Sequence, residues 1–285
     1  MADERIGVVT DSLAWIPDDV ATRHGIRVVP LHVTIGSEHF TETVDLTNQE
    51  FYRRLREAKT LPKTSQPSAG EFLDAYREVA QRADAIISVH ASSKLSGTVR
   101  AAEAAATTFR QERPDVRIET LDTQQACTAE GIVAIRAAED AAAGAPFEAV
   151  LANARALMPK PRILFAVETL EYLAKGGRIG RARALLGGLL RIRPILTVVD
   201  GEVAVQDRVR TRAKATERIL EVMAEYAQGR PFGHVGVHHA DVPDQGQLLR
   251  RLIKERFTVP EERFIDAEIG PVIGTYVGPG AFGAT

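Results

Sequence analysis

The sequence contains a single cysteine, Cys127, among its 285 residues. One thiol can neither form a disulfide within the chain nor build a cysteine-rich zinc module. Proteins of reducing compartments commonly show this composition, so a cytoplasmic location is expected.

Long apolar runs are missing as well. The charged residues Asp3, Glu4 and Arg5 stand near the start of the chain, where a secretory signal would carry an apolar segment. No stretch of about 18 residues is apolar and uncharged throughout, as a membrane-spanning helix requires. We therefore expect neither a signal peptide nor a transmembrane segment.

The sequence also lacks a surplus of basic charge. Its 36 Lys and Arg residues against 38 Asp and Glu residues leave a formal net charge of -2. Proteins that neutralise the phosphates of nucleic acids usually carry a basic excess, so nucleic acid is not an expected partner. With 45% hydrophobic residues the chain can bury a core, which argues against a disordered protein.

Familiar catalytic motifs are absent. The sequence contains no Walker lysine motif and no histidine–glutamate zinc helix, and it pairs no nucleophile with a base in a recognisable frame. Residues 278–283 spell a dinucleotide-binding fingerprint, but the strand, helix and acidic residue that this fingerprint needs are missing around it. We therefore expect a binding protein with no catalytic residues and no cofactor.

One group of histidines needs a separate interpretation. His234, His238, His239 and Asp241 lie close together in the sequence, and alternation places His234 and His238 on one face of a strand. Two such histidines can begin a metal site, but no third ligand follows at a suggestive spacing. A strand end that lines a cleft is the favoured interpretation, so no metal site is predicted.

Strands and helices alternate through the first half of the sequence. Apolar runs at 5–10, 26–31, 84–89 and 117–121 are separated by segments with helical spacing. Such an order indicates crossover connections and a parallel sheet. After residue 159 the pattern changes to a hairpin around Asp200-Gly201, followed by further helices and strands.

We therefore predict an α/β protein with two domains. Residues 1–158 would form a Rossmann-like domain with a parallel sheet, and residues 159–285 would form a second α/β domain with a mixed sheet.

Two polar loops in the first half have the chemistry of a small anion site. Ser96-Gly97-Thr98 lies between a buried strand and a helix, where free backbone N–H groups and two hydroxyls can donate to an oxyanion. Thr64-Ser65 precedes Ser68, which opens a capping box of its own, and it offers two more hydroxyls. Asp11-Ser12 is a further candidate contributor. The alternative for Ser96 is that it only caps the helix.

A glycine-rich loop adds positive charge in the second half. Arg178 lies within Gly176-Gly177-Arg178-Ile179-Gly180 and can bind a carboxylate or phosphate through its fork of donors. Further arginines between residues 181 and 212, interleaved with leucines that include Leu189 and Leu190, suit an anionic partner, a membrane surface or a protein. A solvated helix face is the alternative.

The combination of these motifs resembles the DegV family of bacterial fatty-acid-binding proteins. The resemblance extends over nearly the whole chain. The motifs that carry the resemblance are Val9-Thr10-Asp11-Ser12, Thr64-Ser65-Gln66-Pro67-Ser68, Ser92-Ser93-Lys94-Leu95-Ser96-Gly97-Thr98, Leu170-Glu171-Tyr172-Leu173, Gly176-Gly177-Arg178-Ile179-Gly180, Arg193-Pro194-Ile195-Leu196, Val209-Arg210-Thr211-Arg212 and Val277-Gly278-Pro279-Gly280-Ala281.

The resemblance implies a non-catalytic carrier that buries one long-chain fatty acid between its two domains. It implies that Thr64, Ser65 and Ser96, with Gly97 and Thr98, bind the carboxylate. It further implies that a fatty acid kinase is the partner, to which the carrier presents the carboxylate for acyl-phosphate formation. A transient contact with a membrane surface is also expected.

Two residues of the second half complete the implied site. Arg178 matches an arginine that the family places near the exposed carboxylate and the kinase contact. Tyr276 stands where many members have a histidine shortly before the Gly-Pro-Gly motif. A phenol donates a hydrogen bond but does not become a cation near neutral pH, so the local charge differs from that of those members.

Two other functions are compatible with the residues alone. An enzyme acting on a small phosphorylated or carboxylated metabolite would use Thr64, Ser96 and Arg178 as its anion site. A regulatory module would sense a ligand and bind another macromolecule through the arginine-rich stretch at residues 178–212.

Overall fold

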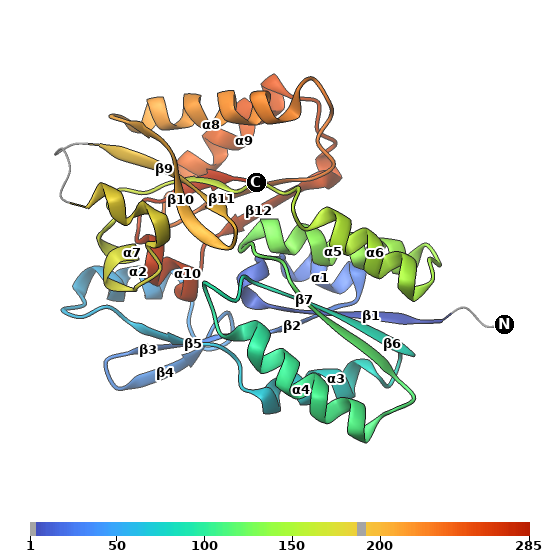
Figure 1. Ribbon diagram of the computed structural model, residues 1–285. Coiled ribbons are helices and arrows are strands. Elements are labelled where there is room, and N and C mark those ends of the chain that lie inside the picture. The colour runs from blue at the N-terminus through green and yellow to red at the C-terminus, as the bar shows by residue number, and fades with distance from the viewer. Residues whose placement is uncertain (1–3, 187–191) are drawn as a thin grey trace. The chain divides into compact units, whose positions relative to one another are not determined.

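The computed structural model describes residues 4–186 and 192–285 (Figure 1). Leu189, Leu190 and Arg191, which we placed in the arginine-rich stretch, lie outside the described residues. The chain divides into two compact units. Unit 1 consists of Met1–His32 and Ser65–Pro161, and unit 2 consists of Val33–Thr64 and Arg162–Thr285.

Unit 1 contains the predicted parallel sheet. Its strand order is β2-β1-β6-β7, and every neighbouring pair is parallel. The strands are β1 (Ile6–Asp11), β2 (Ile26–Val29), β6 (Ala85–His90) and β7 (Arg117–Asp122). Five of the six β1 residues pair with β6, so the carboxyl ends of these two central strands are aligned.

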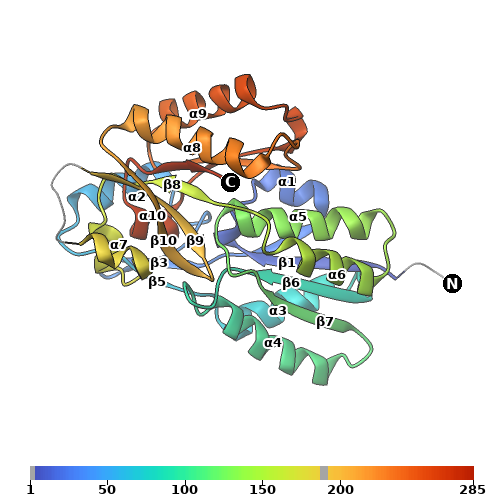
Figure 2. The same cartoon turned by 45° about the horizontal axis from the view of Figure 1, so that its top comes forward.

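Helices cover both faces of this sheet (Figures 1 and 2). The helices α3 (Ala69–Val79) and α4 (Thr98–Glu112) pack on one face and against each other. The other face carries α5 (Thr128–Ala142), with α1 (Asp18–His24) and α6 (Phe147–Leu157) packed beside it. The short helix η1 (Ser12–Ala14) follows β1 directly.

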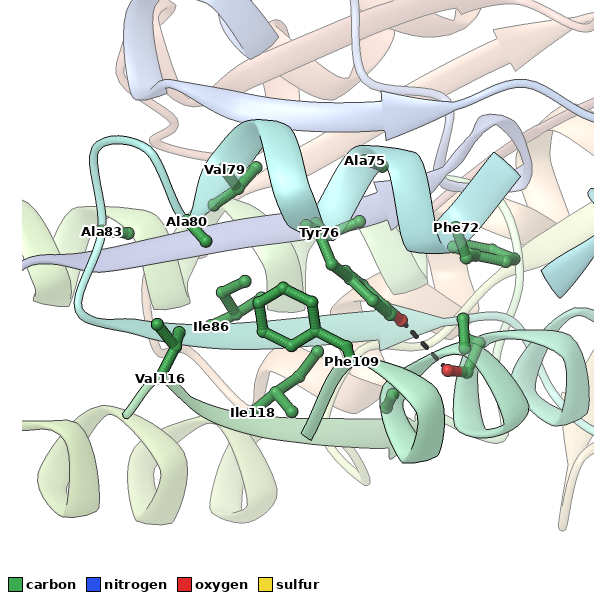
Figure 3. Close-up of a cluster of buried hydrophobic side chains, with 14 of the residues drawn as sticks. Phe72, Ala75, Tyr76, Val79, Ala80, Ala83, Ile86, Phe109, Val116 and Ile118 are labelled. Carbon is green, nitrogen blue, oxygen red and sulfur yellow. Dashed lines mark hydrogen bonds between the residues drawn. The ribbon is translucent and has the colours of Figure 1, made fainter. Parts of the chain in front are cut away.

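The core beneath α3 and α4 is aromatic at its centre (Figure 3). Phe72, Tyr76 and Phe109 are fully buried, and the Tyr76 ring lies edge-on to Phe109 with centroids 5.9 Å apart. Alanines of α4 such as Ala102 and Ala106 let this helix approach the rings closely. The apolar stripe that these residues form on α3 and α4 explains why both helices pack on the sheet.

Unit 2 contains the predicted mixed sheet, with the order β10-β9-β8-β13-β11-β12. Only β11 and β12 are parallel, and the other pairs are antiparallel. The strands are β8 (Leu164–Ala166), β9 (Arg193–Val199), β10 (Glu202–Val209), β11 (Val235–His239), β12 (Phe264–Glu268) and β13 (Phe282–Ala284).

Two long helices pack side by side on one face of the mixed sheet, α8 (Arg212–Ala227) and α9 (Pro243–Arg256) (Figure 2). Their core includes Ile219, Leu249 and Val237. The shorter helices of unit 2 are α7 (Glu171–Lys175), α10 (Pro271–Val277), η2 (Gly180–Leu185) and η3 (Glu261–Arg263). No helix among the described residues is long and apolar enough to span a membrane.

Residues 33–64 group with unit 2, whereas our single predicted boundary near residue 159 placed them in the first domain. The strands β3 (His32–Ile35), β4 (Glu38–Thr41) and β5 (Lys63–Ser65) form a small sheet of their own. Helix α2 (Asn48–Glu57) packs against α10.

The contacts that hold this segment in unit 2 join residues far apart in the sequence. The Tyr52 hydroxyl donates to the Ile269 carbonyl at 2.6 Å, and the Val272 N–H donates to the Glu42 carboxylate at 2.8 Å. Both pairs are more than 200 residues apart. Local sequence patterns contain no sign of such pairings, and this is why one boundary was predicted.

Several local predictions are confirmed. Ser68 and Glu71 form the predicted capping box of α3, and α2 has a similar cap, in which Thr47 accepts from the Glu50 N–H. Asp200 and Gly201 both have positive φ angles, as a tight hairpin turn requires, and they connect the antiparallel strands β9 and β10.

Candidate functional site

In unit 1 the predicted anion-binding loop lies at the N-terminus of α4. The N-cap residue is Gly97, which has no side chain to satisfy the first N–H groups of the helix. Ser96 precedes the cap, and its hydroxyl lies 2.7 Å from the hydroxyl of buried Thr98. The Ser96 hydroxyl also accepts from the Thr98 N–H at 3.4 Å, so a capping contribution from Ser96 remains an alternative to ligand binding. Two hydroxyls and the first backbone amides of α4 are together at one helix end.

Gln66, which the sequence analysis did not single out, lies against the same helix end. A Cβ atom on Gly97 would be 3.1 Å from the Gln66 side-chain Nε2 and Cδ. Gly97 therefore leaves room for the Gln66 carboxamide beside the first turn of α4. Its position within the polar loop Thr64–Ser68 was the available signal. Ser65, the neighbour of Gln66 in that loop, is exposed.

In unit 2 three predicted site residues lie together. The hydroxyls of Thr64, on β5, and Tyr276, on α10, share a hydrogen bond. The Arg178 guanidinium carbon lies 4.9 Å from the centroid of the Tyr276 ring, which is a cation–π distance. Arg178 also donates to the Gly176 carbonyl at 2.9 Å. Tyr276 thus contacts a hydroxyl at its tip and a cation on its face.

Glycine is required at two positions of the loop that carries Arg178. A Cβ on Gly176 would lie 2.3 Å from the Tyr276 ring, so a larger residue would displace the tyrosine. Gly180 has a φ of +50° and lies against the Val203 backbone. The glycines therefore serve both the turn and the close approach of Tyr276.

Three arginines of the arginine-rich stretch are paired with acidic groups. Glu168 forms ion pairs with both Arg193 and Arg212. Although partial burial raises the pKa of Glu168, hydrogen bonds from the two arginines lower it below the usual value. Arg181 pairs with Asp200 and Glu202. These pairs reduce the charge available to an anionic macromolecule, which weakens the case for the regulatory module.

Asp11 and Ser12, our further candidates, make structural contacts instead. Asp11 caps η1 by accepting from the Leu13 N–H at 3.0 Å, and the Ser12 hydroxyl accepts from the Leu31 N–H at 3.0 Å. Asp11 is fully buried.

A buried relay in unit 1 was missed by the sequence analysis. Ser88 Oγ lies 2.6 Å from His90 Nε2, and His90 Nδ1 lies 2.8 Å from Asp11 Oδ2. This order matches a serine–histidine–aspartate triad. All three side chains have no exposed surface, and the Ser88 hydroxyl shares a hydrogen bond with the Tyr76 hydroxyl at 2.9 Å. Because no substrate reaches a nucleophile buried in this way, the relay is a structural element of the core.

The histidines of the second unit do not form a shared site. His234 bonds to Arg263, and Asp241 pairs with Arg56. His238 is 2% exposed, and neither ring nitrogen has a hydrogen-bond partner. Burial, with a smaller contribution from His239, lowers the pKa of His238 to about 4.

Comparison with known proteins places these features in a family context. A family model described as "Uncharacterised protein, DegV family" matches residues 5–285. A DegV domain-containing protein of Clostridium acetobutylicum is 38% identical over 278 residues, which cover 98% of this chain and 96% of that protein.

Two solved structures are similar over nearly their whole length. A DegV family protein from Thermus thermophilus, described for its fatty acid binding, has a TM-score of 0.91 and 38% identity, and the match covers 98% of both chains. DegV of Bacillus subtilis, described as a fatty acid binding protein, has a TM-score of 0.87 and 32% identity over 99% of this chain and 98% of that one.

Proposed function

Since this chain belongs to the DegV family, we propose that it is a carrier that binds a long-chain fatty acid and catalyses no reaction itself. The observation that carries the proposal is the similarity to the Thermus thermophilus fatty-acid-binding structure over 98% of both chains. The serine–histidine–aspartate relay of unit 1 is fully buried, so it offers no accessible nucleophile.

The carboxylate is bound by neutral donors in this proposal. Ser96, Thr98 and the N-terminal amides of α4 supply hydroxyl and N–H groups, with Ser65 as an additional donor. Thr64 is the remaining proposed hydroxyl donor. Burying a carboxylate without such donors would cost several kcal/mol, so these donors are needed for the head group to bind in a buried site.

The acyl tail supplies most of the affinity. Each buried methylene stabilises a complex by about 0.8 kcal/mol, so a dozen of them contribute on the order of 10 kcal/mol before the entropic cost of binding. A short metabolite has no long tail to bury and so gains little of this free energy. The carrier proposal therefore requires that long-chain fatty acids bind much more tightly than short ones, whereas the rival enzyme would bind short anions.

Native mass spectrometry of protein purified from bacteria tests the binding proposal. We expect a co-purifying mass in the range of long-chain fatty acids, and uptake of palmitate or oleate after the bound lipid is removed. A protein that carries no fatty acid and takes up neither one would refute the proposal.

Ser96→Ala tests the assigned carboxylate site. We expect weaker fatty-acid binding by about 1–3 kcal/mol, because a charged group would lose one donor. The matched control is Ser93→Ala, an exposed serine of the same loop. Equal affinity of Ser96→Ala, Ser93→Ala and the wild type would remove Ser96 from the site.

We further propose that a bacterial fatty acid kinase is the partner. The kinase would transfer a phosphoryl group to a carboxylate oxygen of the bound fatty acid, giving an acyl phosphate, and Arg178 with Tyr276 would lie at the head-group contact. Loaded carrier, kinase and ATP should yield acyl phosphate, which hydroxylamine traps as a hydroxamate. If no hydroxamate forms while fatty acid stays bound, the kinase role is refuted and the binding role stands.

We propose in addition that the carrier makes a transient contact with a membrane surface, at which it could take up fatty acid. Transfer of a labelled fatty acid from anionic vesicles should then be faster than transfer from neutral vesicles. Equal transfer rates would argue against a role for the arginines in that contact.

A further inference from the structure

Three side chains with metal-ligating atoms converge inside unit 1. Asp11 stands at the end of β1, His90 at the end of the adjacent strand β6, and Glu130 in the first turn of α5. One ligating atom from each residue lies within 4.8 Å of the other two, and this is the only such group of three in the described residues. All three side chains have no exposed surface.

Two carboxyl groups at this depth need a compensating positive charge. Asp11 and Glu130 are both fully buried and have carboxylate oxygens within 4.8 Å of each other, so a cation bound between them would offset their mutual repulsion. Glu130 Oε1 lies 3.4 Å from the Thr10 hydroxyl, but Oε2 is buried and has no hydrogen-bond partner. A buried carboxylate oxygen without a partner requires a proton or a bound ion.

The surroundings of His90 favour a bound ion. His90 Nε2 lies 2.6 Å from Ser88 Oγ, which lies 2.9 Å from the Tyr76 hydroxyl, and that hydroxyl lies 3.3 Å from the Ala102 carbonyl. Donation from Nε2 to Ser88, from Ser88 to Tyr76 and from Tyr76 to the Ala102 carbonyl is one arrangement that satisfies every member of the chain. In this arrangement the Nδ1 lone pair is available to a metal ion, and metal-bound histidines commonly donate their other N–H in this way.

We propose that Asp11, His90 and Glu130 bind one divalent transition-metal ion, with Zn²⁺ as the representative of its class. One imidazole and two carboxylates are suitable ligands for Zn²⁺, at bond lengths of about 2.0–2.2 Å. Two such bonds span about 4.2 Å, so small side-chain rotations bring the three ligand atoms into range. The ion would neutralise both carboxylates.

The ion has a structural role in this proposal. Because its ligands have no exposed surface, it contacts no substrate and instead fixes the ends of β1 and β6 to the first turn of α5. The proposal is independent of fatty-acid binding.

Refolding with and without metal tests the site. The full chain is unfolded in urea with a chelator and refolded with excess Zn²⁺, and free metal is then removed. We expect one zinc per chain by elemental analysis. At a free metal concentration of a hundred times Kd, the melting temperature should rise by about 5–10 °C. Refolding with Co²⁺ should give the absorption bands of a protein-bound ion.

Glu130→Gln is the critical variant, because it keeps the shape of the side chain and removes a charged ligand. It should bind no zinc and show no metal-dependent rise in melting temperature. The control is Glu71→Gln, since Glu71 contacts His32 at 2.8 Å outside this group and its loss should leave the zinc in place. If Glu130→Gln does not refold, His90→Gln replaces it.

Two results would overturn the proposal. Wild-type protein that refolds without zinc, and melts at the same temperature with and without metal, would show that a shared proton alone compensates the carboxylates. Equal zinc content in the wild type and Glu130→Gln, or in the wild type and His90→Gln, would place the metal elsewhere.

Discussion

His238 lies on β11 with its side chain buried and both ring nitrogens without a hydrogen-bond partner. Burial lowers the pKa of this histidine from 6.5 to about 4, with His239 as the second cause. The folded chain therefore keeps His238 neutral over a pH range in which the unfolded chain protonates it. We expect His238→Asn, which cannot take up this proton, to retain stability in acid that the wild type loses.

The size of the effect follows from proton linkage. Between pH 6.5 and about 4 the unfolded chain binds more protons at His238 than the folded chain does, so the wild-type free energy of unfolding falls as the pH falls. One pKa unit corresponds to about 1.4 kcal/mol. Relative to the variant, the wild type should lose about 2.5 kcal/mol between pH 7.5 and pH 4.5.

Urea unfolding followed by far-ultraviolet circular dichroism measures this difference at a series of pH values. The quantity to compare is the change with pH, because Asn can shift the stability of the neutral protein by a constant amount. His39→Asn makes the same substitution on an exposed strand of unit 2 and should follow the wild type. Parallel pH curves for the wild type and His238→Asn would refute the reasoning.

Two further substitutions test contacts within unit 2. Gly176→Ala places a Cβ 2.3 Å from Tyr276 and should cost about 1–3 kcal/mol of unfolding free energy through displacement of the ring. An unchanged urea midpoint would contradict that contact. Tyr52→Phe removes the 2.6 Å hydrogen bond to the buried Ile269 carbonyl and should also cost about 1–3 kcal/mol. Hydrogen exchange in α2 should increase with it, and unchanged exchange and stability would show that the bond is not needed.

The parts of the fold that depend on neighbouring residues were predictable from the sequence. Thr47 and Ser68 mark helix starts because a side-chain oxygen there meets an N–H only three residues away. Asp200-Gly201 marks the hairpin because both positions require positive φ. The α/β class with a parallel and a mixed sheet followed from the order of such elements and is confirmed.

The parts that depend on distant residues were not predictable in the same way. Nothing near Tyr52 indicates that its partner is Ile269, so residues 33–64 were placed in the wrong group. The relay from Asp11 to His90 joins residues 79 apart, and it forms only because β1 and β6 are neighbours. Within the candidate site, local patterns identified the hydroxyl loops, but not the contact of Gln66 with Gly97.

The interleaved composition of the units has a consequence for synthesis on the ribosome. Every residue of unit 1 has been made once residue 161 is complete, so that unit can fold while the rest of the chain is still to come. Helix α2 is synthesised early, but it cannot pack against α10 until that helix, which begins at Pro271, has also been synthesised. Until then Phe51 and Tyr52, both fully buried in the finished protein, lack their partner helix. A chain cut after residue 161 would therefore be a nascent intermediate with an exposed aromatic surface, and cellular chaperones would be expected to bind it.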